Sequence, residues 1–164
     1  MIIYNIRVPV STPSATATTN LTTIYPGTVR SFLLLEIDFE GQYTSSVNAE
    51  FGIYRTGNTA VPGSLSPTAG AAVPIDNVAT NPVFTGSVYT GTFTTTPPTL
   101  GNLVHSFGLN SNGQRYFWRA NPNANNAVVV SGNTALTGGL TIVLITGSTP
   151  ANCIFSARIQ IGEL

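Results

Sequence analysis

Residues 28–40, TVRSFLLLEIDFE, indicate the fold more strongly than any other stretch of the chain. Apolar and polar side chains alternate along it, as they do along a β-strand with one face buried. For a strand over residues 28–39, the pattern predicts an inner face of Leu33, Leu35, Ile37 and Phe39. The outer face would then carry Leu34, Glu36, Asp38 and Glu40.

The same alternation recurs on both sides of this stretch. Residues 47–55 place Val47, Ala49, Phe51 and Ile53 opposite Asn48, Glu50 and Tyr54, and the last strand places Cys153, Phe155, Ala157, Ile159 and Ile161 in the core. Further strands are expected over residues 1–8, 83–95, 100–109, 115–119, 127–131 and 140–146, with a short one near 71–75. Asn112-Gly113 predicts a hairpin turn between the strands over 100–109 and 115–119.

The fold class that follows is all-β, because helical periodicity is hard to find. Without helices to make parallel crossovers, we expect a single antiparallel β-sandwich that is jelly-roll-like. An immunoglobulin-like sandwich has strands of similar number and length, and it stays open as an alternative. No internal repeat of fixed period points to a propeller or a β-helix.

Two segments are expected to lie outside the sandwich. Residues 1–20, with a low-complexity stretch from Pro9 to Asn20, are interpreted as an extended N-terminal arm, and residues 21–164 as the single sandwich domain. We expect the arm to pair with a neighbour's sheet edge, and the domain to stay folded without it. The Pro- and Gly-rich loop over residues 57–82 is expected to make interface contacts.

Charge is unusually scarce in this chain. Of its 164 residues, 42% are hydrophobic and 7% are charged, with six arginines, six acids and no lysine, whereas a typical soluble domain has roughly 25% charged residues. A surface of Thr, Ser, Asn and Gly with a net charge near zero has little electrostatic resistance to association. We therefore interpret the chain as one that contacts other chains.

The composition also argues against several classes of protein. Apolar runs are too short for a membrane helix and no signal peptide is visible, so we expect no membrane contact and assembly in a host cytoplasm. A single Cys excludes an intrachain disulfide framework. The arginines are scattered rather than clustered, so no nucleic-acid partner is expected. With no nucleophile elbow or Walker motif, we expect neither an enzyme nor a cofactor.

The acids Glu36, Asp38 and Glu40 form the group that most resembles a chemical site. Alternate residues of a strand lie about 7 Å apart on one face, which suits the two carboxylates of an inverting glycosidase or part of a calcium site. The favoured interpretation is structural, with a solvent-facing row beside Arg30 or an Arg of another subunit. Glu36 and Asp38 are therefore interface candidates.

The aromatic stretch Tyr116-Phe117-Trp118 lies between Arg115 and Arg119. Alternation sends Tyr116 and Trp118 to one face and the other three side chains to the opposite face. Aromatic rings and Arg planes suit sugars or bases, yet both are also enriched in subunit interfaces, which is the favoured interpretation. Arg115, Tyr116, Trp118 and Arg119 complete the interface candidates.

The single His and the single Cys are interpreted as packing residues. His105 alternates with Leu103 and Phe107, so we expect all three on one face, in the core or in a subunit contact. One His per chain cannot form a polyhistidine metal site within a subunit. Cys153, beside Ile154 and Phe155, is expected to be a small buried hydrophobe.

Residues 50–56, EFGIYRT, precede a Pro- and Gly-rich loop, and residues 117–122, FWRANP, precede the strands at 128–131 and 140–144 and a last strand ending Ile161-Gly162-Glu163. Together these stretches resemble small β-sandwich structural proteins of tailed bacteriophages, of the capsid cement or decoration kind. The resemblance covers the larger part of the chain, but it consists of strand and turn patterns and transfers no functional residue. It implies a jelly-roll-like subunit, commonly trimeric, that sits on a capsid shell and reinforces contacts between major capsid proteins.

The expected function is therefore that of a non-enzymatic viral structural protein. We expect a homo-oligomer, a trimer by the resemblance, that binds the major capsid protein and stabilises the capsid of the virion. The alternative is the carbohydrate-binding head of a phage fibre or adhesin, using Tyr116, Trp118 and nearby loops. A glycoside hydrolase based on Glu36 and Asp38 ranks third.

Overall fold

The structure is a computed structural model of the chain. It describes residues 1–11, 19–42, 46, 48–56, 68–70, 72–75, 83–90, 98–121, 127–132, 138–146 and 155–164. In this part of the chain, no helix is long and apolar enough to cross a membrane.

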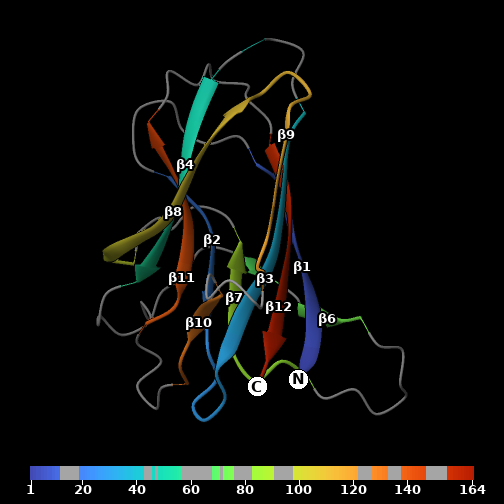
Figure 1. The fold of residues 1–164 in the computed structure, drawn as a ribbon, viewed down its shortest axis with the longest axis vertical. Coiled ribbons are helices and arrows are strands. Elements are labelled where there is room, and N and C mark those ends of the chain that lie inside the picture. The colour runs from blue at the N-terminus through green and yellow to red at the C-terminus, as the bar shows by residue number, and fades with distance from the viewer. Residues whose placement is uncertain are drawn as a thin grey trace.

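Two antiparallel sheets pack face to face and form a β-sandwich (Figure 1). Sheet A has the order β10 (Val128–Val130), β3 (Phe32–Gly41), β12 (Phe155–Glu163), β1 (Ile2–Ser11) and β6 (Ala72–Pro74), and β9 (Arg115–Arg119) also pairs with β3. Sheet B has the order β5 (Thr68–Gly70), β7 (Ser87–Thr90), β2 (Thr19–Tyr25), β11 (Leu140–Thr146), β4 (Asn48–Thr56) and β8 (Leu100–Asn110). The predicted all-β sandwich is confirmed.

The strand pairing is nested, as in a jelly roll. The first strand, β1, pairs with the last, β12, and the pairs β2 with β11, β3 with β9 and β4 with β8 follow inward along the chain. These eight strands make two four-stranded sheets, β1-β12-β3-β9 and β2-β11-β4-β8, which is a jelly-roll arrangement. An immunoglobulin-like sheet would pair the first two strands, whereas β1 and β2 lie in different sheets.

The apolar core fills the space between the two sheets. At one end, four aromatic rings meet, Phe39 and Phe155 from sheet A and Phe51 and Phe107 from sheet B, with ring centroids between 4.6 and 5.9 Å apart. Such aromatic pairs contribute about 0.5–1.5 kcal/mol each beyond the area that they bury. The inward alternation predicted for β4 and β12 is confirmed at every described position, while Val47 and Cys153 lie outside the described residues.

The inner face of β3 differs from its prediction. Strand β3 begins at Phe32 rather than at residue 28, and it buries Phe32 and Leu34 together with Ile37 and Phe39. The reason is a β-bulge: Gln160 pairs with Glu36 and Ile161 with Leu34, so Leu35 has no partner on β12. One extra residue reverses the alternation of everything before it. The prediction that Leu33 and Leu35 face the core is therefore wrong.

Residues 2–8 form an interior strand of sheet A rather than a projecting arm. Strand β1 pairs with β12 on one side and with β6 on the other, and Tyr4, Ile6 and Val8 are buried in the core. Residues 12–18, which hold most of the low-complexity stretch, lie outside the described residues. The strand interpretation of residues 1–8 thus replaces the arm. Because β1 lies inside sheet A and supplies core residues, we expect the domain to need residues 1–20 in order to fold.

The turn predicted at Asn112-Gly113 is present, and Gly113 has a φ of +66°, a conformation that favours glycine. It does not close a hairpin, because β8 belongs to sheet B and β9 to sheet A. The turn is an arch that carries the chain from one sheet to the other. Gly41, at the end of β3, allows the close approach of this arch, because a Cβ on Gly41 would lie 2.6 Å from the carbonyl oxygen of Ser111.

Candidate functional site

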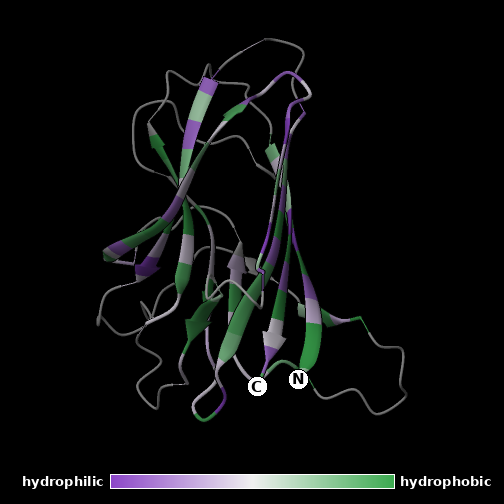
Figure 2. Cartoon of the chain, in the orientation of Figure 1, coloured by the Kyte–Doolittle hydropathy of each residue, from purple (hydrophilic) through white to green (hydrophobic). Residues whose placement is uncertain are grey.

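Charged side chains gather on the outer face of sheet A. The register of β1, β12, β3 and β9 places four of the six arginines and three of the six acids there: Arg7, Arg115, Arg119, Arg158, Glu36, Asp38 and Glu40. Figure 2 shows this hydrophilic face along β9 and the adjoining half of β3, while the halves of β3 and β1 near the chain termini are hydrophobic. The bulge at Leu35 marks the boundary, where the Leu35 carbonyl accepts a hydrogen bond from the Ala120 N–H at 2.8 Å.

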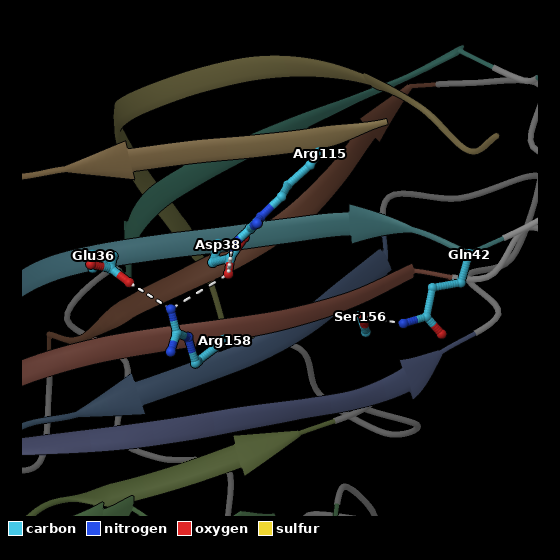
Figure 3. Close-up of polar contacts among 6 residues, drawn as sticks. All are labelled: Glu36, Asp38, Gln42, Arg115, Ser156 and Arg158. Atoms are coloured by element: carbon cyan, nitrogen blue, oxygen red, sulfur yellow. Dashed lines mark hydrogen bonds and ion pairs between the residues drawn. The ribbon is translucent and has the colours of Figure 1, made fainter. Parts of the chain in front are cut away.

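Two carboxylates on β3 hold three arginines in one ion-pair network, and Figure 3 draws the contacts of two of them, Arg115 and Arg158. The Arg158 Nη2 donates to Glu36 Oε1 at 2.9 Å and lies 3.6 Å from Asp38 Oδ2. Arg119 contacts the second oxygen of Glu36 at 3.1 Å. Arg115 binds Asp38 through both nitrogens of its fork, Nε at 2.5 Å and Nη2 at 2.6 Å. The partners come from β9 on one side of β3 and β12 on the other.

This network changes the interpretation of the acidic row. The hydrogen bonds from Arg115 lower the pKa of Asp38 below its ordinary value, although burial acts in the opposite direction. A glycosidase general acid needs a raised pKa, so Asp38 does not have the property that this role requires. The expectation of a solvent-facing row beside Arg30 is wrong, because Glu36 is buried and Arg30 pairs with Glu163 at 3.3 Å. The partners of Glu36 and Asp38 belong to the same chain.

Beside the network lies a depression of about 570 Å³, which we call the sheet A groove. Val73 of β6 closes one side of the groove. The polar side chains that line it come from β1, β3, β9 and β12, and they are Asn5, Arg7, Asp38, Glu40, Arg115, Ser156 and Arg158. The Ser156 hydroxyl accepts a hydrogen bond from Gln42 Nε2 at 2.7 Å. The groove is thus built on the face of a sheet, with ion-paired residues in its lining.

Tyr116 and Trp118 lie on the inner side of β9, as alternation predicts relative to Arg115, Phe117 and Arg119. Tyr116 stacks on Phe107 with ring centroids 4.1 Å apart, and burial raises the pKa of its hydroxyl. Trp118 lies 6.2 Å from the ring of His105. Both are half-buried against the core and do not form the exposed aromatic platform expected of a sugar site. Phe117 is the exposed ring of the three.

His105 is half-buried between the sheets and hydrogen-bonds the Tyr116 hydroxyl. Phe107 shares its inward face, as predicted, but Leu103 does not. The register shifts between Ile53, which pairs with His105, and Tyr54, which pairs with Leu103, so the alternation reverses. Leu103 instead packs over Gly52 with Tyr54 and Ile145, outside the core.

Glu163 is a buried acid that the sequence reasoning missed. Its Oε1 accepts hydrogen bonds from the Thr85 N–H at 3.0 Å and from the Thr85 hydroxyl, and its Oε2 lies 3.4 Å from the Tyr4 hydroxyl and 3.3 Å from Arg30. Burial, and then the charge of Glu163, raise the pKa of Tyr4. Extending the alternation of residues 155–161 by two would have placed Glu163 inside the sandwich. Its contacts join β12, β1 and the segments before β3 and β7.

The outer face of sheet B is different. Thr23, Thr141 and Val143 are fully buried although they point away from the core, and the two threonine hydroxyls hydrogen-bond each other at 2.9 Å. Tyr25 is buried there too, which raises its pKa to about 12. Along β2 and β11 this face is covered within a single chain, while Asn48 and Glu50 of β4 stay exposed.

Within the described ranges, no three His, Cys, Asp or Glu side chains are grouped so as to hold a metal ion. Comparisons with protein-family models, with curated proteins and with solved structures find no match for this chain.

Proposed function

We propose that the chain is a non-enzymatic structural subunit of a virus particle, a capsid cement or decoration protein. It acts as a homo-oligomer, a trimer by its sequence resemblance, and it stabilises the shell through contacts with the major capsid protein. The observation that supports this most is a surface with few charges and several exposed apolar side chains. Val29 is 86% exposed and Val83 is 83% exposed, and Val73 and Phe117 are more than half exposed.

Such a subunit needs no chemistry to work. Each copy buries a modest apolar patch, and attachment at many equivalent lattice positions multiplies weak contacts into durable attachment. Jelly rolls occur in viral capsid proteins and also in lectins, so the fold agrees with the proposal but does not select it. The low charge favours a protein that is covered by neighbours, because a surface without net charge associates readily.

Heads of the phage that encodes the chain provide the test. We expect the protein to co-purify with the heads, and heads that lack it to burst at a lower temperature. Phe117→Ser removes an exposed ring and should lower occupancy on the heads, whereas Asn102→Ala, an exposed polar position on β8, serves as the control. Heads that burst at the same temperature with and without the protein would contradict the role.

A further inference from the structure

We propose that the sheet A groove binds an acidic saccharide, meaning a sugar with one carboxylate and several hydroxyl groups. This binding function goes beyond the proposed structural role and does not depend on it. The volume of about 570 Å³ lies within the range of small-ligand sites, which is roughly 300–1,000 Å³. The groups that line the groove indicate the chemistry of the ligand.

Arg7 supplies an unmatched positive charge at the groove. It forms no salt bridge with any described residue, whereas Arg115 and Arg158 are both paired with Asp38. Arg7 also stands directly opposite Arg158 in the register of β1 and β12, and like charges in that position repel. A carboxylate bound at Arg7 would relieve this repulsion and would accept charge-assisted hydrogen bonds.

Glu40 is an exposed acceptor in the same groove, and Asn5 holds a second acceptor that is buried. The Oδ1 of Asn5 is buried without a hydrogen-bond partner, and an unsatisfied buried acceptor of this kind calls for an explanation. Glu40 forms no salt bridge among the described residues. Hydroxyl groups of a sugar are donors to Glu40, and to Asn5 Oδ1 once that side chain turns toward the groove, while the sugar carboxylate binds Arg7.

The groove disfavours the other anionic ligands. Asp38 and Glu40 line it and repel a polyanion such as a nucleic acid. An extended peptide gains affinity by adding a strand at a sheet edge, but this groove lies over the middle of sheet A, where β12 pairs on both sides. A sugar carries its own donors and acceptors, and Val73 with the Arg stems offers apolar surface to its C–H groups.

The lining of the groove is held in place before any ligand arrives. Arg158 is fixed by Glu36 and Asp38, and Arg115 is fixed by its two bonds to Asp38 (Figure 3). Side chains ordered in this way lose less conformational entropy on binding. Arg7 and Glu40 remain the two charged groups of the groove available to a ligand.

The test is to titrate the full chain separately with N-acetylneuraminic acid, glucuronic acid, glucose and a short acidic peptide. Isothermal calorimetry measures the affinity of each, and changes in amide chemical shift locate the residues that bind. We expect at least one acidic sugar to bind about tenfold more tightly than glucose, with shifts at Asn5, Arg7 and Ser156 and weaker binding at high salt. Arg7→Gln should lower that affinity about tenfold or more.

Arg55→Gln is the matched control, because Arg55 is also exposed and without a salt bridge among the described residues, but it lies on β4 away from the groove. It should leave binding unchanged. Equal unfolding temperatures for the wild type and both variants establish that each is folded. No acidic sugar bound at millimolar concentration, equal affinity for glucose, tighter binding of the peptide, or an unchanged affinity in Arg7→Gln would each overturn the proposal.

Discussion

The outer face of sheet A carries four exposed arginines and three acids, of which Glu36 is buried beneath its arginine partners, whereas the outer face of sheet B buries Thr23, Thr141 and Val143 within the same chain. Both faces come from strands with the same two-residue alternation. On sheet A the charges neutralise one another through Glu36 and Asp38. On sheet B the threonine hydroxyls satisfy each other away from water. The difference shows that the polar side of a strand predicts an outer face but not whether solvent reaches it.

Removing residues 1–20 should have the largest effect. Strand β1 carries Asn5 and Arg7 on the exposed face of sheet A and Tyr4, Ile6 and Val8 in the core, and its loss would uncover β12. We expect the truncated chain to show no cooperative thermal transition by circular dichroism. A sharp transition near that of the full chain would mean that the segment is dispensable, as an arm would be.

A carboxylate introduced on each outer face should distinguish the two faces by the loss of stability that it causes. Val143→Glu on sheet B buries an unpaired carboxylate and should cost more than about 4 kcal/mol of the free energy of unfolding, or abolish folding. Val129→Glu is the matched variant on sheet A, where Val129 is 43% exposed, and should cost less than about 1 kcal/mol. Urea denaturation measures both, and equal losses would contradict the contrast.

Variants of Glu163 extend the comparison to a charge that is buried inside the sandwich rather than on an outer face. Glu163→Ala leaves Thr85 and Tyr4 without their carboxylate, and it should cost about 2–4 kcal/mol of the free energy of unfolding. Glu163→Gln keeps an acceptor for the Thr85 N–H but loses the charge that faces Arg30, so it should cost less than the Ala variant. The same denaturation experiment ranks them, and two equal costs would contradict a hydrogen-bonding role.

The smallest effect should come from the ion-pair network on the outer face of sheet A. Arg115 lowers the folded-state pKa of Asp38 below the unfolded value of about 3.9, so ionised Asp38 stabilises the fold above that pH. This contribution is lost as the pH falls through the folded-state pKa. The stability difference between wild type and Asp38→Asn should therefore be largest near neutral pH and shrink in acid and in high salt. A difference that grows on acidification would contradict the pairing.

The fold could be predicted from the sequence because alternation survives wherever strands are regular. Strand β11 lies at the predicted residues 140–146. Strand β9 lies at the predicted residues 115–119, and its side chains point to the predicted faces. The errors fall at Leu35 and Leu103, where an extra residue in the ladder reverses the faces. Composition cannot reveal such bulges, because they depend on the register of the partner strand.

The common placement of the interface candidates could be predicted in part, while their role in an interface stays a prediction. Glu36, Asp38, Arg115 and Arg119 do lie on one face, because β3 and β9 are regular neighbours between Glu36 and Glu40. Arg158 was not connected with them, since its position depends on the long-range pairing of β12 with β3. The groove was missed for the same reason, as its lining comes from strands far apart in the chain.

The most direct measurement is the mass of the isolated chain in solution by sedimentation velocity over a range of concentrations. The central claim is that few charges and exposed apolar side chains are present because sister copies or a lattice cover them. It predicts a defined assembly larger than the 17.2 kDa chain, with a trimer as the expected species. A monomer that stays soluble at high concentration would contradict it.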